Sequence, residues 1–190
     1  MMADVSVTKE GRLSLAYRDL NDLSGKVVEQ FRQQVKELDL SHNRLTDLRF
    51  LQDFENLQSL VLDNNNITSR AKFSPSDYLQ TLWVNHNKID NLSVFIEGVS
   101  KNFPNLKYFS MMNNAAAPSY FNGGTYQQYK DYRLYVISHL PSLQVLDDTP
   151  INEEEREEAR KIYGNRRYSI RSAKSKKKKK KSKDIGEAVA

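Results

Sequence analysis

Histidine and carboxylate side chains are the groups here that could bind a metal or do acid–base chemistry, and the best placed are His42, Asp63 and His86. The repeat pattern described below puts both histidines in one column, two strands apart, and so about 10 Å apart at about 4.8 Å per strand. One zinc ion needs its donors at about 2.0–2.1 Å. We find no nucleophile beside a base and no glycine-rich phosphate loop. The sequence therefore predicts a polar contact surface, with no metal, no cofactor and no enzymatic activity.

The lone tryptophan, Trp83, falls in the same pattern on a surface place instead of a core place, near Tyr108 and Met112. Aromatic residues and methionine are enriched in protein interfaces, and tryptophan dominates their binding energy. We favour a binding surface centred on Trp83. The alternative is that Tyr120 and Phe121, from a later loop, fold back and cover it.

A unit of about two dozen residues positions these side chains. Apolar residues occupy its first, fourth, sixth and eleventh places and asparagine its ninth, which is the leucine-rich repeat pattern. The starts are separated by 22, 22 and 27 residues. Four copies in tandem begin at Val35, Leu57, Leu79 and Leu106, with asparagines Asn43, Asn65, Asn87 and Asn114.

The alternation at places four to six predicts a short strand in each copy. No copy can bury its leucines alone, so the copies must stack into one continuous core. The asparagine carboxamide can bond the backbone where each strand turns, so we expect a buried asparagine ladder. The fold class predicted is α/β: a leucine-rich-repeat solenoid with a curved parallel sheet and short helices on its convex side.

Places three, five, seven and eight of each unit face the concave side of such a stack. Acidic residues gather toward one end of this face, and aromatic or apolar residues gather further along it. The predicted protein-binding residues are Tyr17, Glu37, Asp39, His42, Val61, Asp63, Trp83, His86, Tyr108 and Met112.

The domain predicted from these patterns spans residues 13–164, after a flexible N-terminus at 1–12. Residues 13–20 fit an atypical first repeat, and apolar stripes predict helices over about 24–34 and after Asn91. A C-terminal helical cap should cover residues 117–164. Its loop carries Tyr120, Phe121 and Tyr126, and we favour a packed flap, with a binding loop as the alternative.

Within the cap, the apolar spacing predicts a helix from about Tyr129 that ends before Pro141. Leu143 and Leu146 then return to strand places. Asn152 followed by Glu155 forms a capping-box pattern for a last helix that ends near Gly164.

The net charge of +5 hides two unlike parts. Residues 1–164 carry 18 basic and 22 acidic side chains, whereas residues 165–190 carry 11 and 2. This basic tail has few apolar residues, so we expect it to be disordered. Its Ser169 follows Arg166 and Arg167 and is a candidate phosphorylation site. Three hypotheses stay open for the lysine run: a nuclear localisation or nucleic-acid signal, an anionic-membrane contact, or a solubilising tail. The run is Lys176, Lys177, Lys178, Lys179, Lys180 and Lys181.

The absence of cysteine excludes disulfides and thiolate metal sites, and it fits the cytoplasm or nucleus. We see no signal peptide at the N-terminus. The chain has no run of about 18 apolar residues, so we expect no transmembrane segment.

The repeats resemble the short class of intracellular leucine-rich repeat proteins. The segment from Tyr129 to Tyr163 resembles the cap of that family, whose members include a spliceosomal ribonucleoprotein component and a protein of melanocyte differentiation. The resemblance implies a non-enzymatic adaptor that binds a protein partner, in pigment-cell differentiation or with a membrane-trafficking protein. The alternative it implies is a nuclear ribonucleoprotein component that binds an RNA-binding protein, with the tail on RNA phosphate.

Overall fold

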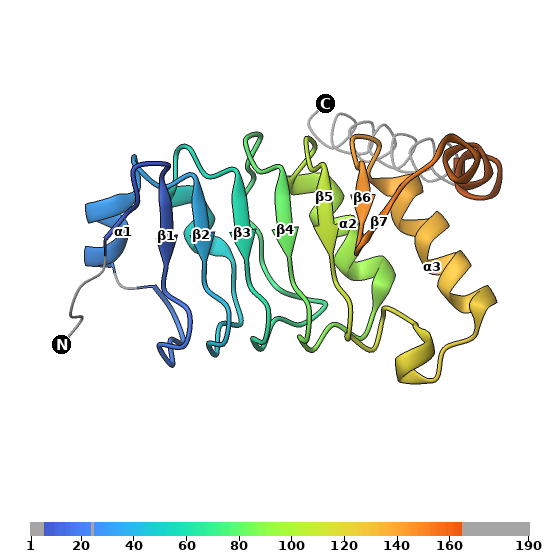
Figure 1. Cartoon of the computed structure of the whole chain (residues 1–190), viewed down its shortest axis with the longest axis horizontal. Coiled ribbons are helices and arrows are strands. Elements are labelled where there is room, and N and C mark those ends of the chain that lie inside the picture. The colour runs from blue at the N-terminus through green and yellow to red at the C-terminus, as the bar shows by residue number, and fades with distance from the viewer. Residues whose placement is uncertain (1–5, 24, 165–190) are drawn as a thin grey trace, which may run out of the picture.

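The computed structural model describes residues 6–23 and 25–164, and these form one stack of parallel strands (Figure 1). Strands β1 to β6 are parallel neighbours in sequence order, and β7 pairs antiparallel with β6. The predicted solenoid is therefore confirmed. The strands are β1 (Arg12–Ser14), β2 (Glu37–Asp39), β3 (Ser59–Val61), β4 (Thr81–Trp83), β5 (Tyr108–Ser110), β6 (Val145–Leu146) and β7 (Thr149–Pro150).

The register of the sheet puts the same place of every unit in one column. In strands β1 to β5 the central residue is buried, while its neighbours face the other side of the sheet. This column, the inner wall of the hydrophobic core, is Leu13, Leu38, Leu60, Leu82, Phe109 and Leu146.

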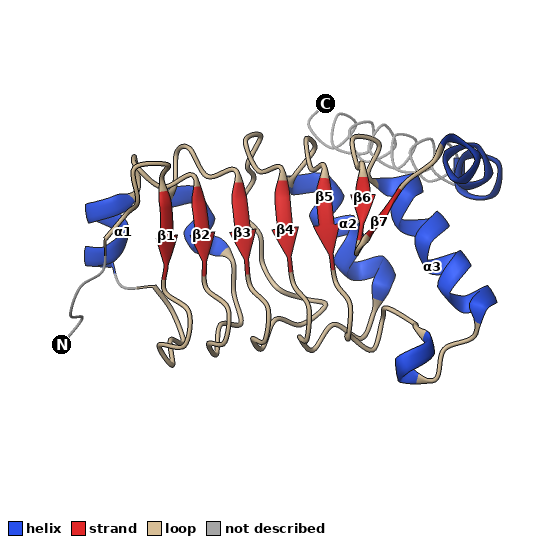
Figure 2. Ribbon diagram, in the orientation of Figure 1, coloured by secondary structure: helices blue, strands red, loops and turns tan. Residues whose placement is uncertain are grey.

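Helical segments behind the sheet close the other side of the core (Figure 2). They are α1 (Gly25–Phe31), the 3-10 helix η1 (Arg49–Asp53) and α2 (Leu92–Asn102). Asn91 caps α2 as predicted, since its side-chain oxygen accepts from the Val94 amide at 3.1 Å. The extra turns of α2 account for the longer 27-residue spacing. The connection over residues 70–78 contains no helix. Strands in equivalent positions can therefore be followed by different segments on the convex side.

The asparagine ladder is confirmed, and Asn65 shows how it works. Its side-chain oxygen accepts from the Leu45 amide at 2.9 Å, and its Nδ2 donates to the carbonyls of Leu40 at 2.9 Å and Leu62 at 3.1 Å. One carboxamide thus satisfies backbone groups of two neighbouring units. Asn43 and Asn114 are buried in the same way, whereas Asn87 is half-buried.

The first unit includes residues that we assigned to a flexible N-terminus. The Gly11 carbonyl accepts from the amides of Lys36 at 2.8 Å and Glu37 at 3.1 Å. Gly11 has φ +89°, and a Cβ there would lie 2.9 Å from the Gln34 carbonyl oxygen. The turn before β1 therefore packs against the second unit, although the expected domain began at residue 13.

The cap comprises the 3-10 helix η2 (Tyr120–Asn122), α3 (Tyr126–His139), β6, β7 and a helix over residues 153–164. Helix α3 begins three residues before the predicted start, because the Thr125 and Gln128 side chains form a capping box that the prediction missed. The capping pair of Asn152 and Glu155 is confirmed, with the Glu155 amide donating to Asn152 at 2.8 Å.

Several predictions fall on residues that the structure does not describe. These are the disorder of residues 165–190, the lysine run Lys176–Lys181 and the candidate phosphorylation site Ser169. Within residues 6–23 and 25–164, no helix has the length and apolar character needed to cross a bilayer.

Candidate protein-binding surface

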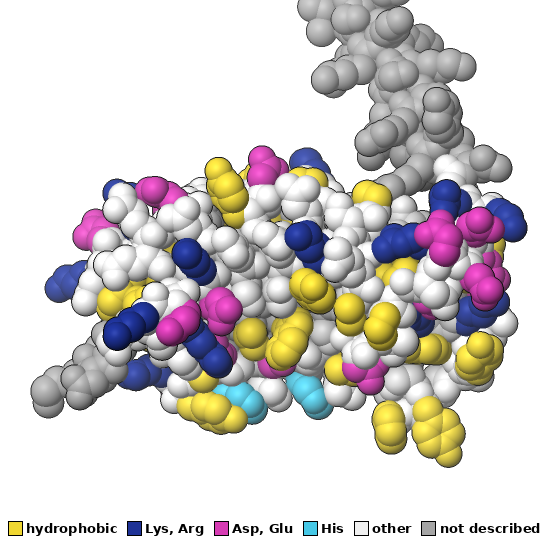
Figure 3. Space-filling model, turned by 45° about the horizontal axis from the view of Figure 1, so that its top comes forward, with side chains coloured by type: hydrophobic (Ala, Val, Ile, Leu, Met, Phe, Trp, Pro, Cys, Tyr) yellow, Lys and Arg dark blue, Asp and Glu magenta, His cyan; other side chains and the backbone are white. Residues whose placement is uncertain are grey.

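The exposed face of the sheet carries Trp83 near its centre. In register, Trp83 of β4 lies between Val61 of β3 and Ser110 of β5, and its side chain is 44% exposed. Figure 3 shows hydrophobic side chains near the middle of the molecule and charged ones toward both of its ends. A shallow depression of about 190 Å³ crosses four strands here, lined by Arg12, Glu37, Leu38, Asp39, Ser59, Val61, Thr81 and Trp83.

The three acidic residues of the predicted binding face differ in exposure and in hydrogen bonding. Glu37 is exposed, whereas Asp39 accepts from the Ser41 hydroxyl at 2.7 Å and lies 3.7 Å from Arg12. Asp63 is half-buried and accepts from the Asn85 amide at 2.9 Å. Burial raises the pKa of the Asp63 carboxyl above its ordinary value, against the hydrogen bonds from Asn85. Glu37 therefore carries the most accessible negative charge of the three, Asp39 is partly neutralised by Arg12, and Asp63 bonds one strand end to the next.

The two histidines lie along the edge of the sheet, each beside the asparagine of the next unit. Asn64 Nδ2 is 3.3 Å from His42 Nε2, and Asn113 Nδ2 is 3.0 Å from His86 Nε2. The Tyr17 ring stacks on His42 with its centroid 4.0 Å away. All five residues have positive φ, which sets their side chains at one edge of the face. Across the described part of the chain, no three His, Cys, Asp or Glu side chains gather as a metal-binding group.

The aromatic end of the face is open. The Tyr108 hydroxyl donates to Gln144 at 3.4 Å, and both Tyr108 and Met112 are exposed. Tyr120 and Phe121 are 89% and 93% exposed, so the favoured interpretation of their loop as a packed flap is wrong. The physical reason is local: the Ser119–Asn122 capping box and the left-handed Gly123 fix a turn that points both rings outward. Tyr126, also assigned to the loop, lies instead in the first turn of α3.

A buried polar chain connects this face with the cap, and sequence reasoning missed it. Ser110 donates to Asn85 Oδ1 at 2.6 Å, and Asp147 Oδ1 accepts from the Met111 amide at 3.0 Å. The Tyr132 hydroxyl donates to Asp147 Oδ2 at 3.1 Å. Burial raises the pKa of Asp147, and burial together with the Asp147 charge raises that of Tyr132. A carboxylate directly after the strand residue Leu146 was the only sequence indication of this chain.

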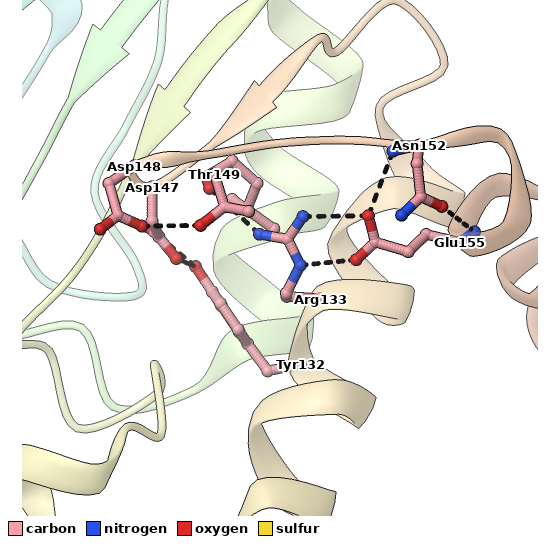
Figure 4. Close-up of polar contacts among 8 residues, drawn as sticks. Tyr132, Arg133, Asp147, Asp148, Thr149, Asn152 and Glu155 are labelled. Atoms are coloured by element: carbon pink, nitrogen blue, oxygen red, sulfur yellow. Dashed lines mark hydrogen bonds and ion pairs between the residues drawn. The ribbon is translucent and has the colours of Figure 1, made fainter.

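An ion pair that the sequence analysis also missed joins the elements of the cap (Figure 4). Arg133 of α3 is buried and makes two hydrogen bonds to Glu155, from Nε at 2.8 Å and from Nη2 at 3.2 Å. Its Nη1 donates to the Leu146 carbonyl at 3.2 Å. This guanidinium therefore ties α3 to β6 and to the last helix.

These features define a class of protein: a solenoid of short parallel strands, held by an asparagine ladder, that leaves one curved sheet face open. The family model described as "Leucine-rich repeat" matches residues 25–182. The chain belongs to the leucine-rich repeat family.

Two curated proteins are similar over most of the domain. The human leucine-rich melanocyte differentiation-associated protein is 33% identical over 129 residues, which cover 65% of this chain and 65% of that protein. The U2 small nuclear ribonucleoprotein A′ of Candida albicans is 29% identical over 168 residues, covering 86% of this chain and 66% of that protein. The chain thus spans about two thirds of the length of these relatives.

A solved structure shows the same fold. A chain of the SNF/U2A′ complex of Drosophila melanogaster aligns with a TM-score of 0.60 and 23% identity, covering 80% of each chain.

Proposed function

We propose that this protein is a non-enzymatic adaptor that binds a protein partner on the concave sheet face around Trp83. One observation carries the proposal: Trp83 is 44% exposed beside Val61, at the edge of a depression that also holds Glu37 and Asp39. A large aromatic residue buries about 150–250 Å² in all, and the 44% of Trp83 that is exposed is the part left for a partner to cover. Such residues dominate interface energies. The acidic rim favours a partner that brings basic residues to the N-terminal end of the face.

The similarity to the human melanocyte protein supports a role of this adaptor in pigment-cell differentiation. As an alternative within this proposal, its partner is a membrane-trafficking protein. In this proposal the protein works in the cytoplasm, and the basic tail either contacts anionic membrane or keeps the protein soluble.

A second function is favoured by the A′ relatives and by the lysine run. In it the protein is a nuclear ribonucleoprotein component whose domain binds an RNA-binding protein and whose tail contacts RNA phosphate. Deleting residues 165–190 separates the two functions. A nuclear protein that moves to the cytoplasm on deletion supports the second, whereas an unchanged cytoplasmic distribution contradicts it.

Affinity purification with matched variants tests the concave face. Trp83→Ala and Tyr108→Ala should each lose the partner that copurifies with the wild-type chain. Tyr78→Ala removes an exposed tyrosine from the connection before β4, and this control variant should still copurify with the partner. Unchanged recovery with Trp83→Ala and Tyr108→Ala would contradict binding at this face.

A further inference from the structure

The loop between the last full repeat and α3 holds two aromatic side chains in solvent. Tyr120 and Phe121 of η2 are more exposed than any other large hydrophobic side chain in residues 6–23 and 25–164. Their rings meet edge to face, with centroids 6.0 Å apart. The short helix η2 lies at the lower right of the fold, away from the centre of the sheet (Figure 1). Exposed apolar groups gathered in this way mark an interaction surface.

The backbone beneath these rings is firmly held. The Ser119 amide donates to Asn122 Oδ1 at 2.8 Å, and Asn122 Nδ2 donates to the Ala117 carbonyl at 2.8 Å. The Gly124 amide donates to the Ser119 carbonyl at 2.8 Å, and Gly123 turns the chain with φ +81°. Because the turn is already ordered, little conformational entropy remains to be lost when a partner covers the rings.

A groove lies directly beside Phe121. It has a volume of about 290 Å³ and runs between the end of the last repeat and the start of α3. We call it the cap groove. Its lining is Met112, Asn113, Ala117, Pro118, Ser119, Phe121, Tyr129, Tyr132, Asp147 and Asp148.

The charged side chains that line the cap groove have one sign. The Asp147 carboxylate accepts hydrogen bonds from the Tyr132 hydroxyl and the Met111 amide. Asp148 is exposed at the groove, and its carboxylate accepts from the hydroxyl of its neighbour Thr149 at 2.9 Å. The adjoining hollow shares Pro118 and Tyr132 with the cap groove and adds exposed Asp131. Among the described residues that line these two hollows there is no lysine or arginine. Phosphate groups of RNA or of anionic lipid would therefore be repelled, while a cation would be attracted.

We propose that the cap groove and the Tyr120–Phe121 turn bind a protein segment that presents an aromatic or aliphatic side chain next to a lysine or arginine. The apolar side chain enters between Met112 and Phe121, and the cation meets the carboxylate of Asp148. This site is separate from the Trp83 face, and its occupant can differ from the partner proposed there.

Selection from a random twelve-residue peptide library displayed on phage tests the site with the full-length protein. The groove variant is Phe121→Ser with Asp148→Lys. The matched control is Tyr78→Ser with Asp77→Lys, which makes the same changes at an exposed pair on another surface. Because all four residues are exposed, both variants should keep the wild-type circular dichroism and melting temperature.

The proposal expects enriched peptides with an apolar residue beside Lys or Arg. Their affinity should fall about tenfold or more in the groove variant and stay unchanged in the control. In fluorescence anisotropy, replacing the basic residue of such a peptide by Glu should abolish binding. The proposal is overturned if no peptide is enriched or if the enriched peptides are acidic. It is also overturned if the enriched peptides bind both variants equally well. It is also overturned if the groove variant selectively loses binding to a Lys176–Lys181 peptide, to oligouridine or to phosphatidylserine vesicles instead.

Discussion

The repeats and the cap bury their polar groups by different means. Each repeat uses one asparagine in the same place, and Asn65 alone bonds backbone groups of two units. The cap uses pairs that occur once: Arg133 with Glu155, and Tyr132 with Asp147. The ladder asparagines are neutral and equivalent to one another, whereas the cap depends on charged groups with single partners. A stack can therefore be extended by copying, but its end must be closed by unique contacts.

The largest loss of stability should come from Arg133→Ala in the cap. The substitution leaves the half-buried Glu155 carboxylate without its ion-pair partner and the Leu146 carbonyl without the Nη1 donor. Breaking a fully buried pair costs about 3–5 kcal/mol, and because Glu155 is partly exposed we expect a loss at the lower end of this range. Urea unfolding measures the change. Arg160→Ala removes an ion pair that is exposed on both sides and should cost under about 1 kcal/mol. Equal losses in the two variants would contradict the special role of the cap pair.

Removing one rung of the ladder should be the next largest effect. Asn65→Ala leaves the buried Leu45 amide and the carbonyls of Leu40 and Leu62 without the carboxamide, at a cost of about 2–3 kcal/mol. Asn87→Ala is the internal comparison. Because Asn87 is half-buried, water can replace part of what is lost, and the unfolding free energy should fall by less. A larger loss for Asn87→Ala than for Asn65→Ala would show that burial does not determine how much each ladder asparagine stabilises the fold.

The Tyr132–Asp147 contact should respond to pH in the direction opposite to ordinary acid denaturation. Burial raises the pKa of Asp147, so the folded state holds the proton more tightly than the unfolded chain. The charged form therefore costs stability above the raised pKa, and that cost fades as pH falls through it toward the ordinary value of 3.8.

Asp147→Asn tests this sign. The advantage of the variant over the wild type should be largest at neutral pH and should disappear as pH falls below the raised pKa of Asp147. Chemical unfolding at a series of pH values measures the difference. An advantage that grows as pH falls would contradict the assignment. Tyr132→Phe, which removes the hydroxyl donor, should cost about 1 kcal/mol.

The smallest change in stability should come from the binding face. Trp83→Ala should shift the unfolding free energy by about 1 kcal/mol or less, because the side chain is half exposed and lies outside the core column. Thermal unfolding followed by circular dichroism checks this. A loss comparable to that of Arg133→Ala would make Trp83 a structural residue.

The sequence was sufficient for the repeated features and insufficient for the unique ones. Leucine and asparagine recur at fixed places of the unit, so the burial of Leu60 and Asn65 follows from their spacing. The exposure of Trp83 follows from its surface place in the same unit. Arg133 and Asp147 gain their roles only when α3 crosses the end of the sheet, and nothing in their spacing predicts that contact. The outward turn of Tyr120 and Phe121 was missed because a capping box of only four residues, Ser119 to Asn122, determines it, against a general preference for burying aromatic side chains.

The most direct test of the proposed binding face is photo-crosslinking in cells from two valines on opposite sides of the sheet. Val61 lies in the depression beside Trp83, and Val94 is exposed on α2 behind the sheet. p-Benzoylphenylalanine at position 61 should crosslink to one discrete protein, and Trp83→Ala should abolish this crosslink. The same residue at position 94 should give no such crosslink. A partner captured from position 94 alone, or one captured from position 61 that survives Trp83→Ala, would contradict binding on the concave face.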